Sequence, residues 1–344
     1  MAVYFYAHPE AFQDPGGGKV QLEKTKEYLE KEGLEIRLYD QRSHQLHPGD
    51  IFHAFGSLKQ SYGLMKSAKE AGAKLVLSTI CWYDFPSALC AYPDFGRRAL
   101  NTLRHLAKIF FPWVPSARKA LMHLSDLLMP NSEAEARQLV RYFGADPKKI
   151  AVIPNGVDSK YISPDPKPFT DRYHLKDFFL CVGRIEPRKN QLGLVRAHRG
   201  LEKPLVIIGD PVSTYPDYDR QCRKEAGANV RFLGSLPHDS DLLRSAYAAC
   251  DTFVLPSWFE TPGLAALEAG LAGAKVLITQ GGATKEYFGD RVFYADPLRL
   301  SDIRAKMKEA AGASTNGKLS EYIRANYLWK RVAEKVAAAY QTLQ

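Results

Sequence analysis

The sequence predicts an α/β protein with two doubly wound domains, each a parallel sheet covered by helices. Short apolar runs alternate with amphipathic helical stretches, which is the sequence form of parallel strands joined by crossover helices. The alternation stops near residue 154 and restarts near residue 178. A chain of 344 residues also suits two cores better than one. We therefore expect domains over residues 1–165 and 166–325, followed by a C-terminal helix over residues 326–344.

In the first domain, the apolar run Val3–Ala7 predicts a buried strand, and Gln21–Lys31 predicts a helix with charges on one face. Later apolar runs of the same kind predict further strands at Glu35–Tyr39, Ile51–Phe55, Lys74–Ser78, Leu127–Pro130 and Ala151–Pro154. Residues 155–178 are rich in Asn, Gly, Asp and Pro and lack periodicity, so they predict a linker.

The second domain repeats the pattern. Strands are expected at Phe178–Val182, Pro204–Ile208, Val230–Leu233, Thr252–Leu255, Lys275–Ile278 and Val292–Tyr294, with helices at Asp241–Ala249 and Leu264–Leu271. An amphipathic segment, Lys318–Gln344, closes the chain. Ligands of such sheets bind beyond the carboxyl ends of the strands, so we expect the site in a cleft between two facing domains.

The composition narrows the class of protein. With 45% hydrophobic and 25% charged residues, the chain is neither disordered nor fibrous. No apolar run approaches a membrane span, and the first residues lack a secretion signal. Five scattered cysteines indicate reduced thiols in a cytoplasmic protein, not a disulfide framework or a zinc site. The net charge of +9 fits nucleic acid, an anionic membrane or a phosphate-bearing ligand equally well.

Two glycine-rich or basic segments follow predicted strands. Gly16, Gly17 and Gly18 precede the first helix, where they either form a flexible turn or let the backbone approach an anion. Arg184 and Lys189 follow the first strand of the second domain, either as a solvated basic loop or as phosphate ligands.

A pair of carboxylates follows the strand Thr252–Leu255. Glu260 lies in the loop and Glu268 lies about one turn into the next helix. The amides at the start of that helix are expected to face the same ligand, and a carboxylate here can accept two sugar hydroxyls. Because Thr261 already provides a polar group for the turn, a capping role explains Glu260 poorly, and we favour a functional one.

These residues resemble a family. The run Phe253–Ala269 is similar to the glutamate–seven residues–glutamate motif of retaining glycosyltransferases of family 4, which have the GT-B fold of two Rossmann-like domains facing across a cleft. The resemblance extends in order through several further landmarks: Pro130–Ser132, Val152–Asp158, Val182–Arg184, Lys189–Asn190, Val230–Gly234, Gly270, Gly273, Gly281, Gly282 and Glu286.

The resemblance implies roles for these residues. Arg184 and Lys189 would bind the donor diphosphate and stabilise the charge that develops as the nucleotide leaves. Glu268 would hold the ribose hydroxyls, and Glu260 would contact the donor sugar near the reacting centre. Gly16–Gly18 would close over the diphosphate. The backbone of the turn formed by Thr261, Pro262, Gly263 and Leu264 would contact the phosphate or the sugar of the donor.

The implied activity is transfer of a sugar from a UDP- or GDP-sugar to an acceptor hydroxyl, as in polysaccharide or glycolipid synthesis. The implied fold returns the C-terminal helix to the first domain. The acceptor would be a sugar, a glycan or a lipid-linked molecule. Family members often have a His after the fourth strand, but here that segment is Ser78–Asp84, so Trp82, Tyr83 or Asp84 is expected to replace it.

No cofactor, essential metal or nucleic acid is expected. Asp217–Asp219 spells DxD, which binds a metal in a different glycosyltransferase fold, but it is expected in a surface loop. The nine His lack metal-binding spacing. Three alternatives stay open: a nucleotide-sugar binding protein without turnover, a polyanion-binding protein, and a sugar-nucleotide epimerase of the same fold.

Residues 95–125 are basic and aromatic, with no Asp or Glu. This composition fits a peripheral segment that contacts an anionic membrane or the acceptor, or else two helices whose aromatic residues fill the core. The candidate contacts are Arg97, Arg98, Arg104, Lys108 and Trp113.

Overall fold

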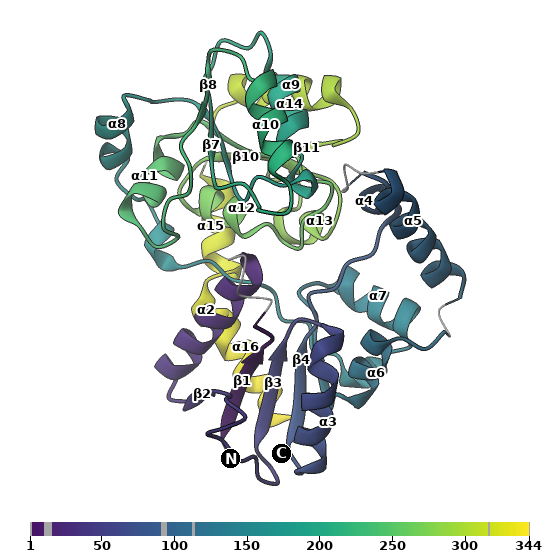
Figure 1. Ribbon diagram of the computed structural model, residues 1–344. Helices are drawn as coiled ribbons and strands as arrows, with labels where there is room; N and C mark the ends of the chain where they lie inside the picture. Colours follow the sequence, from purple (N-terminus) through teal and green to yellow (C-terminus); the bar gives the residue numbers. More distant parts are fainter. Residues whose placement is uncertain (1, 10–15, 91–94, 112–113, 316, 344) are drawn as a thin grey trace. The chain divides into compact units, whose positions relative to one another are not determined.

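The computed structural model describes residues 2–9, 16–90, 95–111, 114–315 and 317–343. These residues form two compact units (Figure 1). The first unit comprises Met1–Tyr83, Leu103–Gly156 and Trp329–Gln344, and the second comprises Asp84–Thr102 and Val157–Leu328. The chain therefore enters the second unit twice, and it returns to the first unit the second time for its last helix.

The first unit is built on a parallel sheet with the order β2-β1-β3-β4-β5 in the described part of the chain. Its strands are β1 (Val3–Ala7), β2 (Ile36–Leu38), β3 (Ile51–Phe55), β4 (Lys74–Ser78) and β5 (Leu127–Met129). The chain winds from β1 to one side and then back to β3 on the other. This reversal confirms the predicted doubly wound form.

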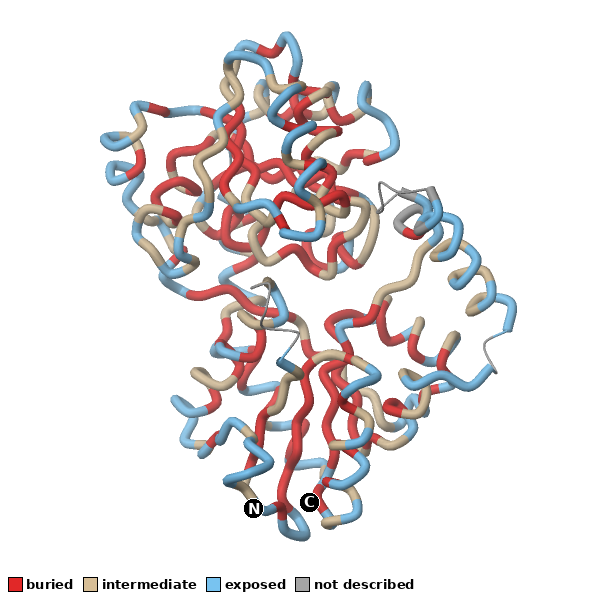
Figure 2. The backbone as a smooth tube through the Cα atoms, viewed as in Figure 1, coloured by how far each residue is buried: buried red, intermediate tan, exposed pale blue. Residues whose placement is uncertain are grey.

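Helices cover this sheet: α2 (Gly17–Lys31), α3 (Tyr62–Glu70), α6 (Ala117–Leu124), α7 (Glu133–Phe143) and α16 (Trp329–Gln341), with one-turn helices η1 (Lys59–Ser61) and η2 (Pro147–Lys149). The short α4 (Phe85–Cys90) lies in a segment of the second unit, and the longer α5 (Phe95–Phe110) begins in that segment and ends in the first unit. The apolar strands are buried between these layers, as the red strands in Figure 2 show.

The second unit has a parallel sheet with the order β11-β10-β9-β6-β7-β8 among the described residues. Its strands are β6 (Phe179–Val182), β7 (Leu205–Ile208), β8 (Val230–Phe232), β9 (Thr252–Leu255), β10 (Lys275–Thr279) and β11 (Phe293–Ala295). The strand order reverses between β6 and β9, which pair directly. The carboxyl ends of these two strands form the topological switch point, where ligands of doubly wound sheets bind.

The helices of the second unit are α8 (Lys167–Tyr173), α9 (Gln191–His198), α10 (Pro216–Glu225), α11 (Asp241–Ala249), α12 (Leu264–Leu271), α13 (Thr284–Phe288), α14 (Leu300–Gly312) and α15 (Lys318–Asn326), with one-turn helices η3 (Ser159–Tyr161) and η4 (Pro187–Lys189). They enclose one continuous apolar core. The fold-class prediction is confirmed, and so is the return of the C-terminal helix, because α16 lies in the first unit.

Three local predictions were wrong. Ala151–Pro154 is extended but forms no strand, because it bonds to β5 and its flank only through single amides, Ala151 N to Leu128 O and Ile153 N to Pro130 O. The expected linker over residues 155–178 contains η3 and α8, whose Tyr161 and Phe169 belong to the core.

The third wrong prediction concerns Asp217–Asp219, which lies in the first turn of α10 and not in a loop. Pro216 is pre-organised to begin a helix, and acidic residues are stabilised at a helix N-terminus. Both carboxylates are paired, Asp217 with Arg220 and Asp219 with Arg223.

Candidate active site in the second unit

Two loops meet at the switch point of the second sheet. One follows β6 and carries Arg184 and Lys189, and the other follows β9 and carries Glu260. Lys189 Nζ donates to Glu260 Oε1 over 2.7 Å, although the two residues are 71 positions apart. Parallel strands that pair directly bring their following loops together, which explains this meeting.

The loop after β6 is fixed by its own residues and by its neighbour. The fully buried Gln191 donates from Nε2 to Arg184 O over 2.7 Å, which braces the basic end of the loop. Asn190, at the start of α9, donates from Nδ2 to Pro256 O over 3.1 Å and so ties this loop to the one after β9. Its left-handed φ of 56° is tolerated by Asn better than by most residues.

Backbone contacts hold Glu260. Its N–H donates to Gly281 O over 3.2 Å, and its carbonyl accepts from Ala283 N over 2.9 Å. Gly282 has a φ of 94°, and a Cβ there would lie 2.0 Å from Glu260 O. A glycine is therefore required at position 282 for the segment to approach Glu260 this closely.

The Glu260 carboxylate is buried among cations. Oε1 accepts from Lys189 and from Ser257 Oγ, at 2.6 Å for the serine, and lies 3.7 Å from Arg188 Nη1. Burial alone raises the pKa of Glu260, but Lys189, Arg188 and the hydrogen bonds outweigh it and hold that pKa below its ordinary value. Glu260 is therefore an anion at neutral pH, with its negative charge shared by two basic side chains.

Arg184 belongs to the same charged network. Its Nη2 lies 3.4 Å from Glu186 Oε1, which also accepts from Arg188 Nη2 over 3.1 Å. Arg188 in turn reaches Glu260, so Arg184 and Lys189 are connected through two carboxylates, Glu186 and Glu260, and the guanidinium between them. The Arg184 side chain is 35% exposed, whereas that of Lys189 is 14% exposed. Arg184 is thus the more accessible cation for an arriving anion.

Glu268 lies in α12 with partners of its own. Its Oε1 lies 2.7 Å from His238 Nε2, and its Oε2 accepts from Tyr247 OH over 2.9 Å. Tyr161 OH donates to the carbonyl of His238 over 2.8 Å, which fixes the loop that carries the imidazole. Each carboxylate oxygen can accept two hydrogen bonds, so Glu268 has acceptor capacity beyond these two partners.

The predicted contacts Thr261–Leu264 form the turn into α12. Gly263 is the N-cap residue with a φ of 88°, and a Cβ there would lie 3.3 Å from Ile278 Cδ1. The N-terminal end of a helix attracts anions through its amides and its dipole. Glu260 and Glu268 therefore lie on either side of a helix start, as expected from the sequence.

Gly16–Gly18 and residues 78–83 lie in the first unit, and Asp84 begins a segment of the second unit. Gly16 is the N-cap of α2, which begins at Gly17. Tyr83 is held by its own unit, because its N–H donates to Gln138 Oε1 over 2.8 Å and Arg118 bonds its hydroxyl. Trp82 and Tyr83 are both half-buried.

The basic stretch over residues 95–125 contains α5 and α6. Arg98 and Arg104 are exposed, whereas Lys108 Nζ is buried 4.4 Å from the centroid of the Phe143 ring. The side chain of Arg97 and the whole of Trp113 lie outside the described residues.

Sequence reasoning missed several residues of the site. Ser257, Arg188 and Glu186 lie in the loops that it singled out, so their proximity to a strand end was the available signal. His238 follows β8 in the same way, but its meeting with Glu268 is a long-range contact. Nothing in the local pattern distinguishes Tyr247 of α11 from an ordinary core tyrosine.

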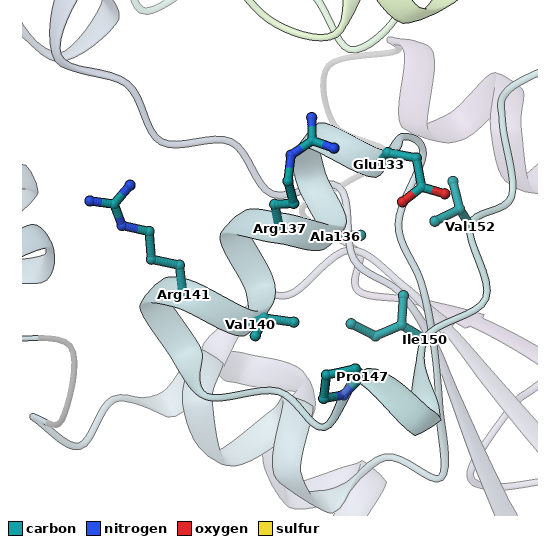
Figure 3. Close-up of a pocket in the computed structure, with 8 residues that line it drawn as sticks. All are labelled: Glu133, Ala136, Arg137, Val140, Arg141, Pro147, Ile150 and Val152. Atoms are coloured by element: carbon teal, nitrogen blue, oxygen red, sulfur yellow. The ribbon is translucent and has the colours of Figure 1, made fainter.

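One pocket lies apart from these residues, and the described residues contain no group of metal ligands. A shallow pocket on α7 lies in the first unit and is lined by Glu133, Ala136, Arg137, Val140, Arg141, Pro147, Ile150 and Val152 (Figure 3). Within the described part of the chain, no three His, Cys, Asp or Glu residues gather as metal ligands would. The expectation that no metal is needed stays a prediction.

Family comparisons agree with this arrangement. The family described as "Glycosyltransferase Family 4" matches residues 15–161, and "Glycosyl transferases group 1" matches residues 167–326. The chain belongs to glycosyltransferase family 4. Each match falls largely within one of the two units, so the sequence features of the family are present in both halves of the chain.

Curated relatives match part of their length. This family member is 31% identical over 245 residues to a D-inositol 3-phosphate glycosyltransferase of Geodermatophilus obscurus, a match over 63% of the chain and 52% of that relative. It is 30% identical over 198 residues to the O-antigen chain mannosyltransferase B of Escherichia coli, over 54% of the chain and 51% of the relative. The chain thus spans about half the length of these relatives.

Solved structures confirm the fold. Sucrose-phosphate synthase from Thermosynechococcus elongatus superposes with a TM-score of 0.78 at 17% identity, covering 99% of this chain and 98% of that one. Anabaena Alr3699/HepE in complex with UDP and glucose gives a TM-score of 0.73 at 16% identity and covers 99% of both chains. The family member therefore has the GT-B fold.

Proposed function

We propose that this protein is a retaining glycosyltransferase that moves a sugar from a nucleotide diphosphate sugar to an acceptor hydroxyl. The observation that carries the proposal is the buried pair of Lys189 and Glu260 at the switch point, joined through Arg188 and Glu186 to the more exposed Arg184. Family membership makes an epimerase or a protein that only binds polyanions less favoured than a transferase.

In this proposal, Arg184 and Lys189 stabilise the diphosphate as it leaves with the bonding electrons of the anomeric C–O bond. Fixed cations in a site with little water stabilise developing negative charge strongly, because they need no reorganisation during the reaction. The contacts of the Glu260 carboxylate in the described structure all end at Oε1. Oε2 is then the oxygen that accepts a hydroxyl of the donor sugar.

Glu268 would hold the ribose of the donor. A carboxylate can accept from two neighbouring hydroxyls, and the His238 and Tyr247 contacts fix its orientation before the nucleotide arrives. We include His238 as a positioning residue in the proposal, since it acts through Glu268.

A panel of UDP- and GDP-sugars tests the proposal. We expect at least one donor to raise the melting temperature and to be consumed slowly, and NMR of the product to show a retained anomeric configuration. Arg184→Ala should lower kcat about a hundredfold or more, because one preorganised donor is lost.

Arg231→Ala is the matched control, since Arg231 is an exposed residue of the edge strand β8 and should leave kcat unchanged. A donor that binds without ever being consumed would indicate a binding protein and contradict the proposal. An inverted product would contradict the retaining mechanism.

A further inference from the structure

Helix α5 turns an apolar side to solvent. Leu100, Leu103 and Phe110 are 48%, 66% and 64% exposed. Their spacing of three and then seven residues places them on one face of a helix. In Figure 2 the tube of α5 is mostly pale blue, the colour of exposed residues. A surface helix of a globular protein normally places such a stripe against the core.

The side that α5 turns to the protein is more polar. The His105 ring lies 4.9 Å from the Tyr83 ring, and Lys108 Nζ is buried over the Phe143 ring. The helix is therefore oriented with a lysine inward and two leucines and a phenylalanine outward. The usual preference of these residue types predicts the opposite orientation.

The apolar face continues beyond the end of the helix. Phe111 N donates to Ala107 O over 2.8 Å, so the helical turn extends, and Phe111 and Val114 are 50% and 51% exposed. We call Leu100, Leu103, Phe110, Phe111 and Val114 the α5 surface. Single exposed apolar residues are ordinary, but a contiguous group of this kind marks an interaction site.

The charges around the α5 surface indicate its partner. Residues 95–125 contain six Lys or Arg and no Asp or Glu. Arg104 is exposed and lies one helical turn after Leu100. A second copy of the chain would bring the same positive charges face to face, whereas anionic lipid headgroups complement them.

We propose that the α5 surface inserts into the headgroup region of a membrane rich in anionic lipids. The 16 residues of α5 rise about 24 Å, and no described helix is long and apolar enough to cross a membrane. The helix therefore lies along the surface with its apolar side in lipid and the exposed Arg104 among the headgroups. This inference stands on α5 alone and does not rest on the proposed transfer reaction.

Vesicle sedimentation of the full chain tests the inference. We expect binding to phosphatidylcholine vesicles that contain about 30% phosphatidylglycerol, little binding to phosphatidylcholine alone, and a fall in binding with added salt. The double variant Leu103→Gln/Phe110→Gln should weaken binding by about tenfold or more, because two apolar anchors are lost. Arg104→Glu should weaken it about tenfold through charge alone.

Matched controls use the same substitutions elsewhere. Leu298→Gln changes a leucine that is 56% exposed in the second unit, and Arg331→Glu reverses an exposed charge on α16. Both should bind vesicles as the unaltered protein does, and all variants should retain the same circular dichroism spectrum.

Equal binding to neutral vesicles, no binding at low salt, or equal losses in the controls would overturn the inference. So would a concentration-dependent dimer that Leu103→Gln/Phe110→Gln abolishes, since that result would assign the surface to a second copy. Because vesicle binding needs no turnover, these outcomes are independent of whether a sugar donor is found.

Discussion

Lys189 and Glu260 form one contact that bears on stability and, in the proposed mechanism, on chemistry. Both side chains are largely removed from water, at 14% and 6% exposure, so each charge depends on the other. Burial lowers the pKa of Lys189, and Glu260 opposes that change. Removing one partner leaves a buried charge, whereas removing both leaves none.

A double-mutant cycle tests this dependence. Lys189→Met should lower the free energy of unfolding by about 3 kcal/mol, because the Glu260 carboxylate then keeps only Ser257 and the more distant Arg188. Adding Glu260→Gln should recover most of that loss, although both variants should lack transferase activity. Urea unfolding followed by fluorescence measures the cycle. Losses that simply add in the double variant would show that the two charges are not coupled.

The candidate site was only partly predictable at the level of single residues. Arg184, Lys189, Glu260 and Glu268 stand out because each follows a strand end or starts a helix, which is a local signal. The contact between His238 and Glu268 joins residues 30 positions apart. Such a contact depends on the strand order of the sheet, which no local pattern contains.

At the scale of elements, the strand predictions agree with the structure within a residue or so at most ends, because buried parallel strands are continuous apolar runs. The prediction of a linker over residues 155–178 was wrong because the core residues of this segment do not form a continuous apolar run. Its core residues are spaced irregularly among Pro, Asp and Lys, so no apolar period is visible: Val157, Tyr161, Phe169, Leu175 and Phe178. The structure makes this segment part of the core through contacts with α11.

The element α16 is attached to the first sheet through a buried histidine. His53 Nδ1 on β3 lies 2.6 Å from Tyr340 OH of α16, and Nε2 lies 2.9 Å from Ser78 Oγ at the end of β4. Complete burial lowers the pKa of His53 to about 3. The folded protein therefore holds this imidazole neutral well below the pH at which an unfolded chain protonates it.

This burial predicts a pH dependence of stability. Between pH 6.5 and about 3 the unfolded chain binds a proton at His53 that the folded chain does not, so stability falls as the pH falls. The expected slope is up to about 1.4 kcal/mol per pH unit. His53→Gln should lack this contribution. Urea unfolding at pH 7.5, 6 and 5 measures it, and a constant difference between the two proteins at all three values would contradict it.

At the scale of the whole molecule, the chain crosses between its two units near Gly156 and again near Trp329, in addition to the crossings on either side of Asp84–Thr102. It leaves the first unit after Gly156 and returns at Trp329. Val157 N donates to Tyr327 O over 2.7 Å on the second-unit side. On the first-unit side, Gly156 lies against the buried ring of Trp329. The docking of α16 therefore depends on the absence of a side chain at position 156.

Gly156→Ala should consequently destabilise the molecule through α16. An added Cβ would lie 2.7 Å from Trp329 Cδ2, closer than real contacts allow, and an indole ring that is 2% exposed has little room to move. Overpacking of this kind costs about 1–3 kcal/mol. Limited proteolysis should show faster cleavage ahead of α16, together with a lower melting temperature. Trp329→Leu in the Gly156→Ala background should recover part of the loss, because a smaller side chain relieves the clash. Two results would contradict this role of the contact between Gly156 and Trp329. One is that Gly156→Ala is as stable as the unaltered protein. The other is that Trp329→Leu lowers the stability of the Gly156→Ala variant as much as it lowers that of the unaltered protein.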